Sequence, residues 1–489
     1  MSINLSSLSE SATKGFAWTT ISAIGNVFFL LVQYAIMGRM LSAEDFGIMA
    51  MIMTVVGFFS GVSDFGLGSH IVQDDNISIK SIVRFLQIVL ILTSILAVII
   101  SFASGIISSF YNNIEIYRMI PWVSLSIIQA GINQILFSIL QKSLAFKQIA
   151  FTDIITNASS VILAGILAYL GYGVWALIFS LLFSGLVRII VSTLFVFKFL
   201  TLFPKFNQSE SEIVGEFVFF QTGDRILNYL GSNFDKIIIG RFLDPISLGL
   251  YSVSFQLMLK PFSVLNSTVM RVILPLYSKI KDDNVRLGEA YLKSLKMTAL
   301  ISFPIFMALG ICSSSILEFL MGLRWVKAAP LLYVFSILGI FFTLGSPIGA
   351  IILSKGVPRV GFYFNLITTF VYGIAFLIGS NFSIFYVAIS YLISTIFIVF
   401  PLEFFLRRYL IGLTFSKYLI SMKHLFIGCG VPLLIHSFFY LIFPQIIGSV
   451  TSQIIFAFFS IVFFFLYLYI YDLSFIKSII VLLNNIQQK

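Results

Sequence analysis

Charged residues are scarce in this sequence. Only 10% of its 489 residues are Asp, Glu, Lys or Arg, whereas 59% are hydrophobic. Soluble domains carry about a quarter charged residues, so this composition excludes an ordinary water-soluble fold. Runs of about 20 apolar residues, each long enough to cross the hydrocarbon core of a bilayer, recur along the whole chain. The sequence therefore predicts an all-α polytopic membrane protein.

Residues and motifs that carry catalysis are also few. The two cysteines, Cys312 and Cys429, lie in or beside apolar runs, and we expect neither a disulfide nor a metal site from them. The three histidines lack the mutual spacing of a metal site or a triad, and we expect packed or interfacial side chains at His70, His424 and His436. The sequence contains no GxxxxGK(S/T) phosphate loop, so ATP hydrolysis by this chain is not expected. These absences predict that the protein is not an enzyme.

The surplus of positive charge has no nucleic-acid signature. The formal net charge is +10, but the basic residues are scattered between the apolar runs and form no block with interleaved aromatics. The first 14 residues, MSINLSSLSESATK, are polar and precede an apolar run that is too long for a signal-peptide core. We therefore expect no nucleic-acid partner and a first span that is retained.

Apolar runs bounded by Gly, Pro and charged residues define about fourteen transmembrane helices. The predicted spans are residues 15–38, 46–68, 82–107, 116–139, 152–170, 174–197, 214–239, 247–270, 294–312, 329–353, 360–379, 383–405, 418–442 and 450–471. The longest connection, near 271–293, is too short for a soluble domain.

The distribution of Lys and Arg predicts the orientation of these spans. With the N-terminus in the cytoplasm, 21 of the 30 Lys and Arg residues fall on the cytoplasmic side, Arg407 among them. Five fall outside, namely Arg39, Arg118, Arg241, Arg324 and Lys327. Four lie within spans, namely Arg188, Arg225, Lys236 and Lys260. The positive-inside rule then predicts an even number of spans with both termini cytoplasmic.

The chain also repeats itself at an offset of 202 residues. GRMLSAEDFG (38–47) aligns with GRFLDPISLG (240–249), and Thr20, Ile24 and Asn26 align with Thr222, Ile226 and Asn228. The first and seventh spans cross the membrane in the same direction, so the two halves are predicted to be parallel repeats with a shared site between them.

The seventh span holds an unusual number of polar residues. Positions 4, 7 and 11 apart share a helix face, and this spacing relates Gln221, Arg225, Asn228, Ser232 and the pair Asp235–Lys236, with Asp224 at the edge. The first span has a sparser counterpart in Thr19, Ser22, Asn26 and Gln33. A charge at the bilayer centre costs about 2.5–3.5 kcal/mol, so both faces are expected to line a water-filled cavity.

Other interpretations of these charges stay open. Asp235 and Lys236 could instead form a structural ion pair or mark the outer end of the helix. Arg188 and Lys260 lie nearer to helix ends, where snorkelling to the interface competes with a role in the cavity.

Several stretches together resemble one known family. They are GRMLSAEDFG (38–47), DFGLGSHIVQ (64–73), QKSLAF (141–146), GYGVWAL (171–177), NFDKIIIGRFL (233–243) and MGLRWVKAAPLL (321–332). In order and spacing they are similar to the polysaccharide transporter (Wzx-type) flippases of the multidrug/oligosaccharidyl-lipid/polysaccharide exporter superfamily. The resemblance covers roughly residues 10–410, and the last two spans match no motif of the family.

The resemblance implies a V-shaped pair of six-helix lobes with two appended helices. The corresponding domains are residues 1–200 (spans 1–6), 201–408 (spans 7–12) and 409–489 (spans 13–14). It also implies a bacterial inner-membrane protein that moves an undecaprenyl-pyrophosphate-linked oligosaccharide from the inner to the outer leaflet by alternating access. The implied partners are this glycan, membrane lipid, and polysaccharide polymerase and chain-length proteins.

The candidate residues of the cavity suit such a substrate. Arg is well shaped for phosphate, and amides and hydroxyls can bind sugars. The substrate-binding candidates are Arg225, Lys236, Asn228, Gln221, Asn26, Gln33, Arg188 and Lys260. Asp224 and Asp235 are candidates for coupling to H⁺ or Na⁺, and no other cofactor and no metal are expected.

Two other functions compete with this one. A MATE-type cation-coupled multidrug exporter would favour acidic residues in the cavity, whereas here Arg225 and Lys236 accompany the acids. A polysaccharide polymerase or ligase would need a catalytic loop or an acidic metal motif, and the short outer loops offer neither.

Overall fold

A computed structural model describes residues 5–61, 63, 66–74, 77–199, 215–443 and 448–472 of the chain. The side chains of residues 5–14, 16, 73 and 215–228 lie outside this description. The described backbone is almost entirely helical and contains no β-strand. It forms two compact units, Met1–Gly249 (unit 1) and Leu250–Lys489 (unit 2). The predicted domain division at residues 200 and 408 stays a prediction.

The predicted all-α polytopic fold is confirmed. Thirteen candidate spans among the described helices are long and apolar enough to cross a membrane. The predicted seventh span is also helical, as α9 (Gly215–Phe242), and its polar and charged residues set it apart from those thirteen. The chain is therefore a multi-pass membrane protein.

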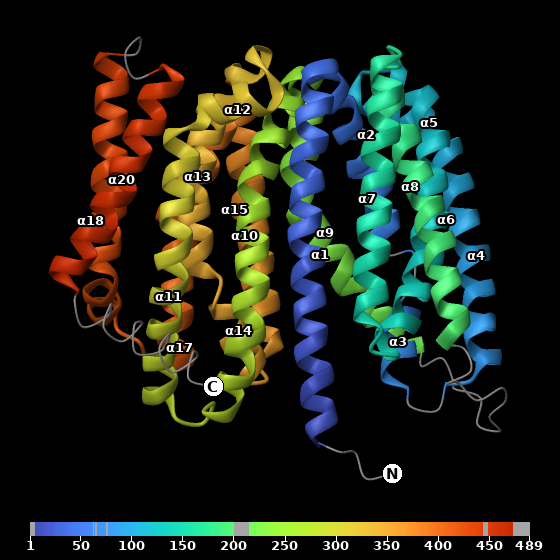
Figure 1. The fold of residues 1–489 in the computed structure, drawn as a ribbon, viewed down its shortest axis with the longest axis horizontal. Coiled ribbons are helices and arrows are strands. Elements are labelled where there is room, and N and C mark those ends of the chain that lie inside the picture. The colour runs from blue at the N-terminus through green and yellow to red at the C-terminus, as the bar shows by residue number, and fades with distance from the viewer. Residues whose placement is uncertain are drawn as a thin grey trace. The chain divides into compact units, whose positions relative to one another are not determined.

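Unit 1 is a bundle in which α7 lies between α1 and α8, and α6 packs against α4 and α8 (Figure 1). Its apolar core between α3, α4 and α6 includes Ile71, Phe85, Val89 and Ile135. Its helices are α1 (Leu5–Met40), α2 (Ala43–Gly61), α3 (Leu67–Gln73), α4 (Ile79–Phe102), α5 (Ser104–Tyr111), α6 (Ile114–Lys142), α7 (Phe146–Tyr169), α8 (Val174–Phe199), α9 and the first turn of α10 (Pro245–Lys279).

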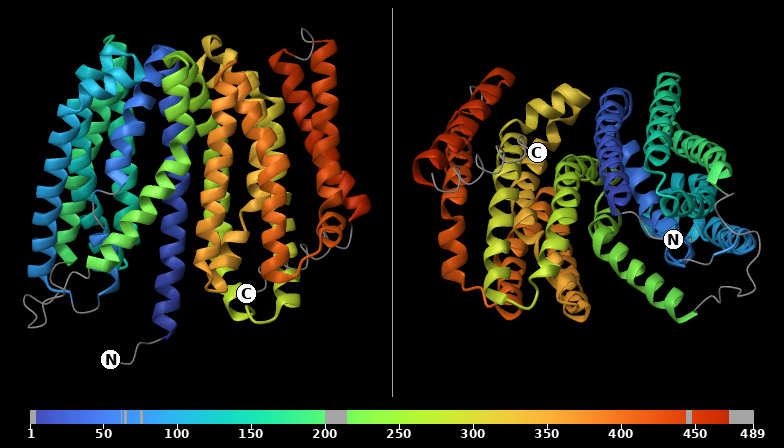
Figure 2. Two further views of the ribbon diagram at one scale, coloured as in Figure 1. Left: turned by 180° about the vertical axis from the view of Figure 1, so that it is seen from behind. Right: turned by 60° about the horizontal axis from the view of Figure 1, so that its bottom comes forward.

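Unit 2 contains the rest of α10 and the remaining helices. These are α11 (Asn284–Ile311), α12 (Ser313–Met321), η2 (Leu323–Ala328), α13 (Ala329–Gly345), α14 (Ile348–Ser354), α15 (Pro358–Ser380), α16 (Ile384–Ser394), η3 (Thr395–Val399), α17 (Phe400–Ile411), α18 (Phe415–Ile442) and α20 (Val450–Tyr471). The last two helices pack against each other, as the red pair in Figure 2 shows, and both also contact α11.

Two spans of unit 2 are interrupted. The span that starts with η2 breaks between α13 and α14, where Pro347 lacks the N–H that a continuous helix would need. The next-but-one span contains a π-helical segment, η3, between α16 and α17. Such π-segments are rare and frequently accompany functional sites.

The repeated decapeptides form two equivalent helix corners. In α1–α2, the Ser42 hydroxyl donates to Asp45 Oδ2 over 2.7 Å, and in α9–α10 the Ser247 hydroxyl donates to Asp244 Oδ2 over 2.8 Å. Residues 42 and 244 are equivalent in the repeat, as are 45 and 247, so the same cap is built with serine and aspartate exchanged.

The two corners also touch through glycine. A Cβ on Gly47 would collide with the Pro245 carbonyl, and a Cβ on Gly249 would collide with the Ala43 carbonyl. Each contact is the repeat image of the other, since 43 aligns with 245 and 47 with 249. Glycine allows the two helix backbones to approach this closely.

Several predicted helix boundaries are wrong, and at two of them the error changes the position of a charged residue in its helix. The fifth span begins at Phe146 and not at 152, so Asp153 lies two turns inside α7. The twelfth span ends at Ile411 and not at 405, so Arg407 lies within α17 and is fully buried. In both cases polar residues at a helix end shortened the apolar run that defined the prediction.

Candidate functional site

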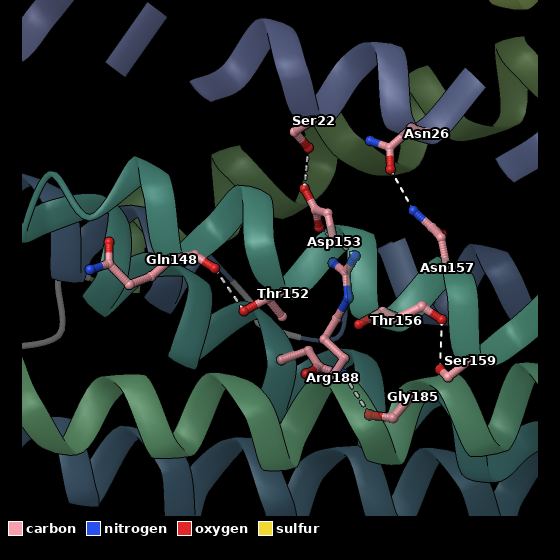
Figure 3. Close-up of polar contacts among 11 residues, drawn as sticks. Ser22, Asn26, Gln148, Thr152, Asp153, Thr156, Asn157, Ser159, Gly185 and Arg188 are labelled. Atoms are coloured by element: carbon pink, nitrogen blue, oxygen red, sulfur yellow. Dashed lines mark hydrogen bonds and ion pairs between the residues drawn. The ribbon is translucent and has the colours of Figure 1, made fainter. Parts of the chain in front are cut away.

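A cluster of polar side chains joins three helices of unit 1. It consists of Ser22 and Asn26 from α1, Asp153 and Asn157 from α7, and Arg188 from α8, and we call it the polar node (Figure 3). These five residues lie within helices that are apolar enough to cross a membrane. Polar groups in such a setting satisfy one another or face water.

Asp153 is the centre of the polar node. Arg188 Nη2 lies 2.6 Å from Asp153 Oδ1, and the Ser22 hydroxyl donates to Oδ2 over 2.6 Å. Both carboxylate oxygens therefore have a donor, one of them charged, which makes these short bonds among the stronger kind. The ion pair is only partly covered, with 36% of the Arg188 side chain and 18% of the Asp153 side chain exposed.

The spacing of the residues explains why they meet. Ser22 and Asn26 are four residues apart on α1, as are Asp153 and Asn157 on α7, so each pair occupies one helix face. Ser22 contacts Asp153, and the Asn157 amide donates to the Asn26 carbonyl oxygen, with the same separation of 131 residues in both cases. A constant separation means that α1 and α7 run parallel, in agreement with the predicted direction of the first and fifth spans.

A second layer of amides supports α8 behind Arg188. Gln129 Nε2 on α6 donates to the Leu182 carbonyl over 2.9 Å, and Asn133 Nδ2 donates to the Gly185 carbonyl. The Gln129 side chain occupies the space that a side chain at Gly185 would need. The turn of α8 that carries Arg188 is thereby fixed against α6.

Two of the predicted site residues, Asp235 and Lys236, lie in the part of α9 whose side chains are described. Asp235 is 3% exposed, and its Oδ1 accepts from the Lys236 backbone N–H over 2.8 Å. The Lys236 ammonium donates to Asn233 Oδ1 over 2.7 Å, and Tyr229 donates to the Met53 carbonyl of α2 over 3.0 Å. Asp235 and Lys236 thus form hydrogen bonds to groups of α9 itself, and α9 packs against α2.

The remaining predicted residues fall into three groups. Asn26 and Arg188 meet in the polar node, and Arg188 pairs with an acid in mid-helix instead of snorkelling from a helix end. Gln33 lies partly buried further along α1, and Lys260 lies partly buried on α10 in unit 2. Four predicted side chains lie outside the described residues, namely Gln221, Asp224, Arg225 and Asn228.

Asp153 and Asn157 were not among the predicted site residues. The signal was available in the stretch TDIITN (152–157), where an acid and an amide four residues apart interrupt an apolar helix. The predicted span 152–170 already contained both residues, so its late start does not explain why they were missed.

The fold defines the class of protein. A lipid II flippase MurJ in an inward closed conformation superposes with a TM-score of 0.71 at 17% identity, covering 94% of this chain and all (100%) of that one. An inward-facing MATE-family multidrug resistance transporter of the MOP superfamily gives a TM-score of 0.63 at 14% identity, over 78% of this chain and 94% of that one. The chain therefore has the fold of the MOP transporters.

Sequence comparison then identifies the family. The model of the polysaccharide biosynthesis protein family matches residues 36–330. The teichuronic acid biosynthesis protein TuaB of Bacillus subtilis is 29% identical over 86% of this chain and 87% of that protein. The lipopolysaccharide biosynthesis protein WzxC of Escherichia coli is 25% identical over 85% of both chains. This chain belongs to the polysaccharide biosynthesis protein family, as the motif resemblance predicted.

Proposed function

We propose that this protein is a flippase that carries a lipid-linked oligosaccharide from the inner to the outer leaflet of a bacterial inner membrane. The observation that carries the proposal is the polar node, a partly accessible guanidinium with amides and a hydroxyl inside a membrane bundle. The MOP fold and the family add support, and another similar protein, ExoT of Rhizobium meliloti, is named a succinoglycan biosynthesis transport protein.

The chemistry of the polar node suits an undecaprenyl-pyrophosphate-linked glycan. A guanidinium has five N–H donors, and the contact with Asp153 uses Nη2, so a diphosphate oxygen can bind to the same side chain. The amides of Asn26 and Asn157 can exchange their mutual bond for bonds to sugar hydroxyls. The glycan would otherwise cross hydrocarbon with unpaired polar groups, at a cost of several kcal/mol for each.

The same proposal assigns the remaining parts of the transport cycle. The polyprenyl tail stays in the bilayer while the head group crosses by alternating access, so no bond is made or broken and the protein is not an enzyme. The delivered glycan would then pass to polymerase and chain-length proteins, and cation coupling supplies directionality.

Complementation of a deletion strain tests the polar node. Arg188→Ala should abolish surface polysaccharide and accumulate the lipid-linked precursor, at unchanged protein level, because the anionic head group loses its cation. Arg118→Ala is the matched control, since Arg118 is an exposed arginine of the same unit. Wild-type polysaccharide in the Arg188→Ala strain would contradict the assignment.

A cation-coupled multidrug exporter is the second candidate, favoured by the fold shared with the MATE transporter and by the acid Asp153. It predicts a different phenotype. A deletion strain would become sensitive to cationic dyes, its precursor pool would not change, and Asp153→Asn would reproduce the sensitivity.

A further inference from the structure

Unit 2 contains a buried ion pair of its own. Arg407 on α17 is 0% exposed, and its Nη2 lies 2.7 Å from Glu403 Oε2, one helical turn earlier. Arg407 Nε donates to the Tyr291 hydroxyl of α11 over 2.7 Å. The rings of Tyr291, Phe400 and Tyr418 surround the guanidinium carbon at 5.3–5.9 Å. Arginine keeps its proton in proteins, so this charge is permanent and Glu403 is its counterion.

The guanidinium is bound to the end of a broken helix. Arg407 Nη2 also donates to the Leu344 carbonyl over 2.9 Å, at the last turn of α13, where the chain breaks before α14. The last carbonyls of a helix carry partial negative charge and attract cations, and in transporters such broken ends coordinate the coupling ions. The guanidinium of Arg407 therefore lies at a helix end that is suited to binding a free cation, although this cation is part of the chain itself.

Glu403 differs from its partner in accessibility. Its side chain is 14% exposed, whereas that of Arg407 is fully covered. The carboxylate fills the space next to Gly345, where any side chain would collide with Oε1. A proton can therefore reach the carboxylate without first uncovering the arginine.

The arrangement leaves buried donors unused. Among the described residues, Arg407 Nη1 and the Tyr418 hydroxyl have no hydrogen-bond partner although both atoms are buried. Buried polar groups without a hydrogen-bond partner destabilise the packed state. Loss of the Glu403 charge would therefore further destabilise a cluster whose hydrogen bonds are already incomplete. Just before α17, η3 adds a second irregular helical segment to this region.

We propose that Glu403 is a proton-binding site of this transporter, and that its protonation releases Arg407 from the end of α13. The proton adds to one carboxylate oxygen and Arg407 keeps its own, so the cluster passes from a neutral pair to a buried unpaired cation, which is strongly unfavourable. Unit 2 then favours an arrangement in which Arg407 is uncovered. The titratable groups around Glu403 are Arg407 of α17, Tyr291 of α11, Tyr418 of α18 and Tyr372 of α15. This inference rests on the proposed transport function for its purpose, but the proton site can be tested without substrate.

Hydrogen–deuterium exchange of the full-length protein in lipid nanodiscs tests the site directly. After correction for intrinsic rates, acidic pH should accelerate exchange severalfold at the end of α13 and in α17 of the wild type. Glu403→Gln should show the fast exchange at both acidic and alkaline pH. Glu289→Gln, which changes an exposed glutamate of α11, should behave as the wild type. A wild type without pH-dependent exchange in these segments, or a pH response kept in Glu403→Gln, would overturn the proposal.

A transport readout separates this proposal from the proposed function. Glu403→Gln should strongly reduce surface polysaccharide at normal protein level, and Glu289→Gln should not. If a deletion strain accumulates no lipid-linked precursor, the proposed function fails, whereas the exchange result still decides the proton site. Normal transport by folded Glu403→Gln in a strain that does depend on the flippase would overturn the proton site alone.

Discussion

At the scale of single residues, the molecule concentrates charge where two side chains can neutralise each other. Arg188 with Asp153 and Arg407 with Glu403 are ion pairs within membrane-spanning bundles, and each is completed by a hydroxyl, from Ser22 or Tyr291. The pairs differ in cover, since Arg188 is 36% exposed and Arg407 is 0% exposed. Because Arg188 is partly accessible, it is suited to binding a ligand. Because Arg407 is buried, it is suited to controlling the conformation of unit 2.

The ion pair of the polar node should show measurable coupling. We expect a double-mutant cycle of Arg188→Ala and Asp153→Ala to give about 0.5–1 kcal/mol of interaction free energy, because the contact is short but partly exposed to the surroundings. The free energy of unfolding in detergent is the measurement. The matched control is Arg286 with Asp283, 3.4 Å apart with side chains 77% and 47% exposed, where coupling should be near zero. Additive effects at Arg188 and Asp153 would show that the pair contributes nothing.

Individual contacts could be predicted only where the sequence fixes the helix register. The offset of 202 residues located the two equivalent corners, because the residues that form each corner are close together in the sequence. Asp153 was not predicted as a site residue, because its partner Arg188 is 35 residues away and lies on a different helix. Arg407 was assigned to a loop because hydropathy falls near its helix end, and only packing against α11, α13 and α18 shows that it is buried.

At the scale of helices, the corner glycines allow two repeat-related elements to come into close backbone contact. Gly47 lies in the first turns of α2 and Gly249 in the first turns of α10, each against the backbone of the other corner. Neither backbone can move aside as a flexible side chain could, so the contact needs glycine at both positions.

Substitution at these glycines should therefore be costly. Gly47→Ala and Gly249→Ala should each lower the yield of folded protein and its thermal stability, because the added methyl group meets a carbonyl oxygen. Gly430→Ala in α18 is the control, since nothing lies within 4 Å of its Cβ position and alanine favours a helix by about 1 kcal/mol. Equal behaviour of Gly47→Ala and Gly430→Ala in a thermal unfolding assay would contradict the close backbone contact.

The C-terminal helix pair is fixed to unit 2 by polar contacts as well as by packing. Gln453 of α20 is 2% exposed, and its Oε1 accepts from the Ser315 hydroxyl over 2.6 Å and from the Ser315 backbone N–H over 3.2 Å. Near the other end of α20, Lys296 of α11 lies 3.0 Å from Asp472. These helices match none of the sequence motifs, yet they are anchored at both ends.

Removal of the Gln453 amide should loosen this anchor. We expect Gln453→Leu to lower the free energy of unfolding by about 1–3 kcal/mol, because buried groups of Ser315 lose their acceptor. Gln87→Leu on the exposed face of α4 is the same substitution without a buried partner and should have little effect. A destabilisation by Gln87→Leu as large as that by Gln453→Leu would mean that the contact to Ser315 contributes little.

At the scale of the whole molecule, the account predicts a topology. The positive-inside rule, applied to the excess of Lys and Arg on one side, predicts that both termini lie in the cytoplasm and that the α9–α10 corner lies outside. A fluorescent protein fused to the C-terminus should fluoresce, and alkaline phosphatase fused after Leu243 should be active. Active phosphatase at the C-terminus would contradict the predicted orientation.

The central claim is that the chain moves a completed lipid-linked glycan between leaflets. The most direct measurement is mass spectrometry of polyprenyl-linked glycans from cells depleted of this protein, combined with an assay of the leaflet in which they reside. The account predicts accumulation of a complete repeat unit confined to the inner leaflet, with its mass naming the substrate. Accumulation only in the outer leaflet would indicate a polymerase or ligase step, and no accumulation, with new sensitivity to cationic dyes, would indicate a drug exporter; either result would contradict the account.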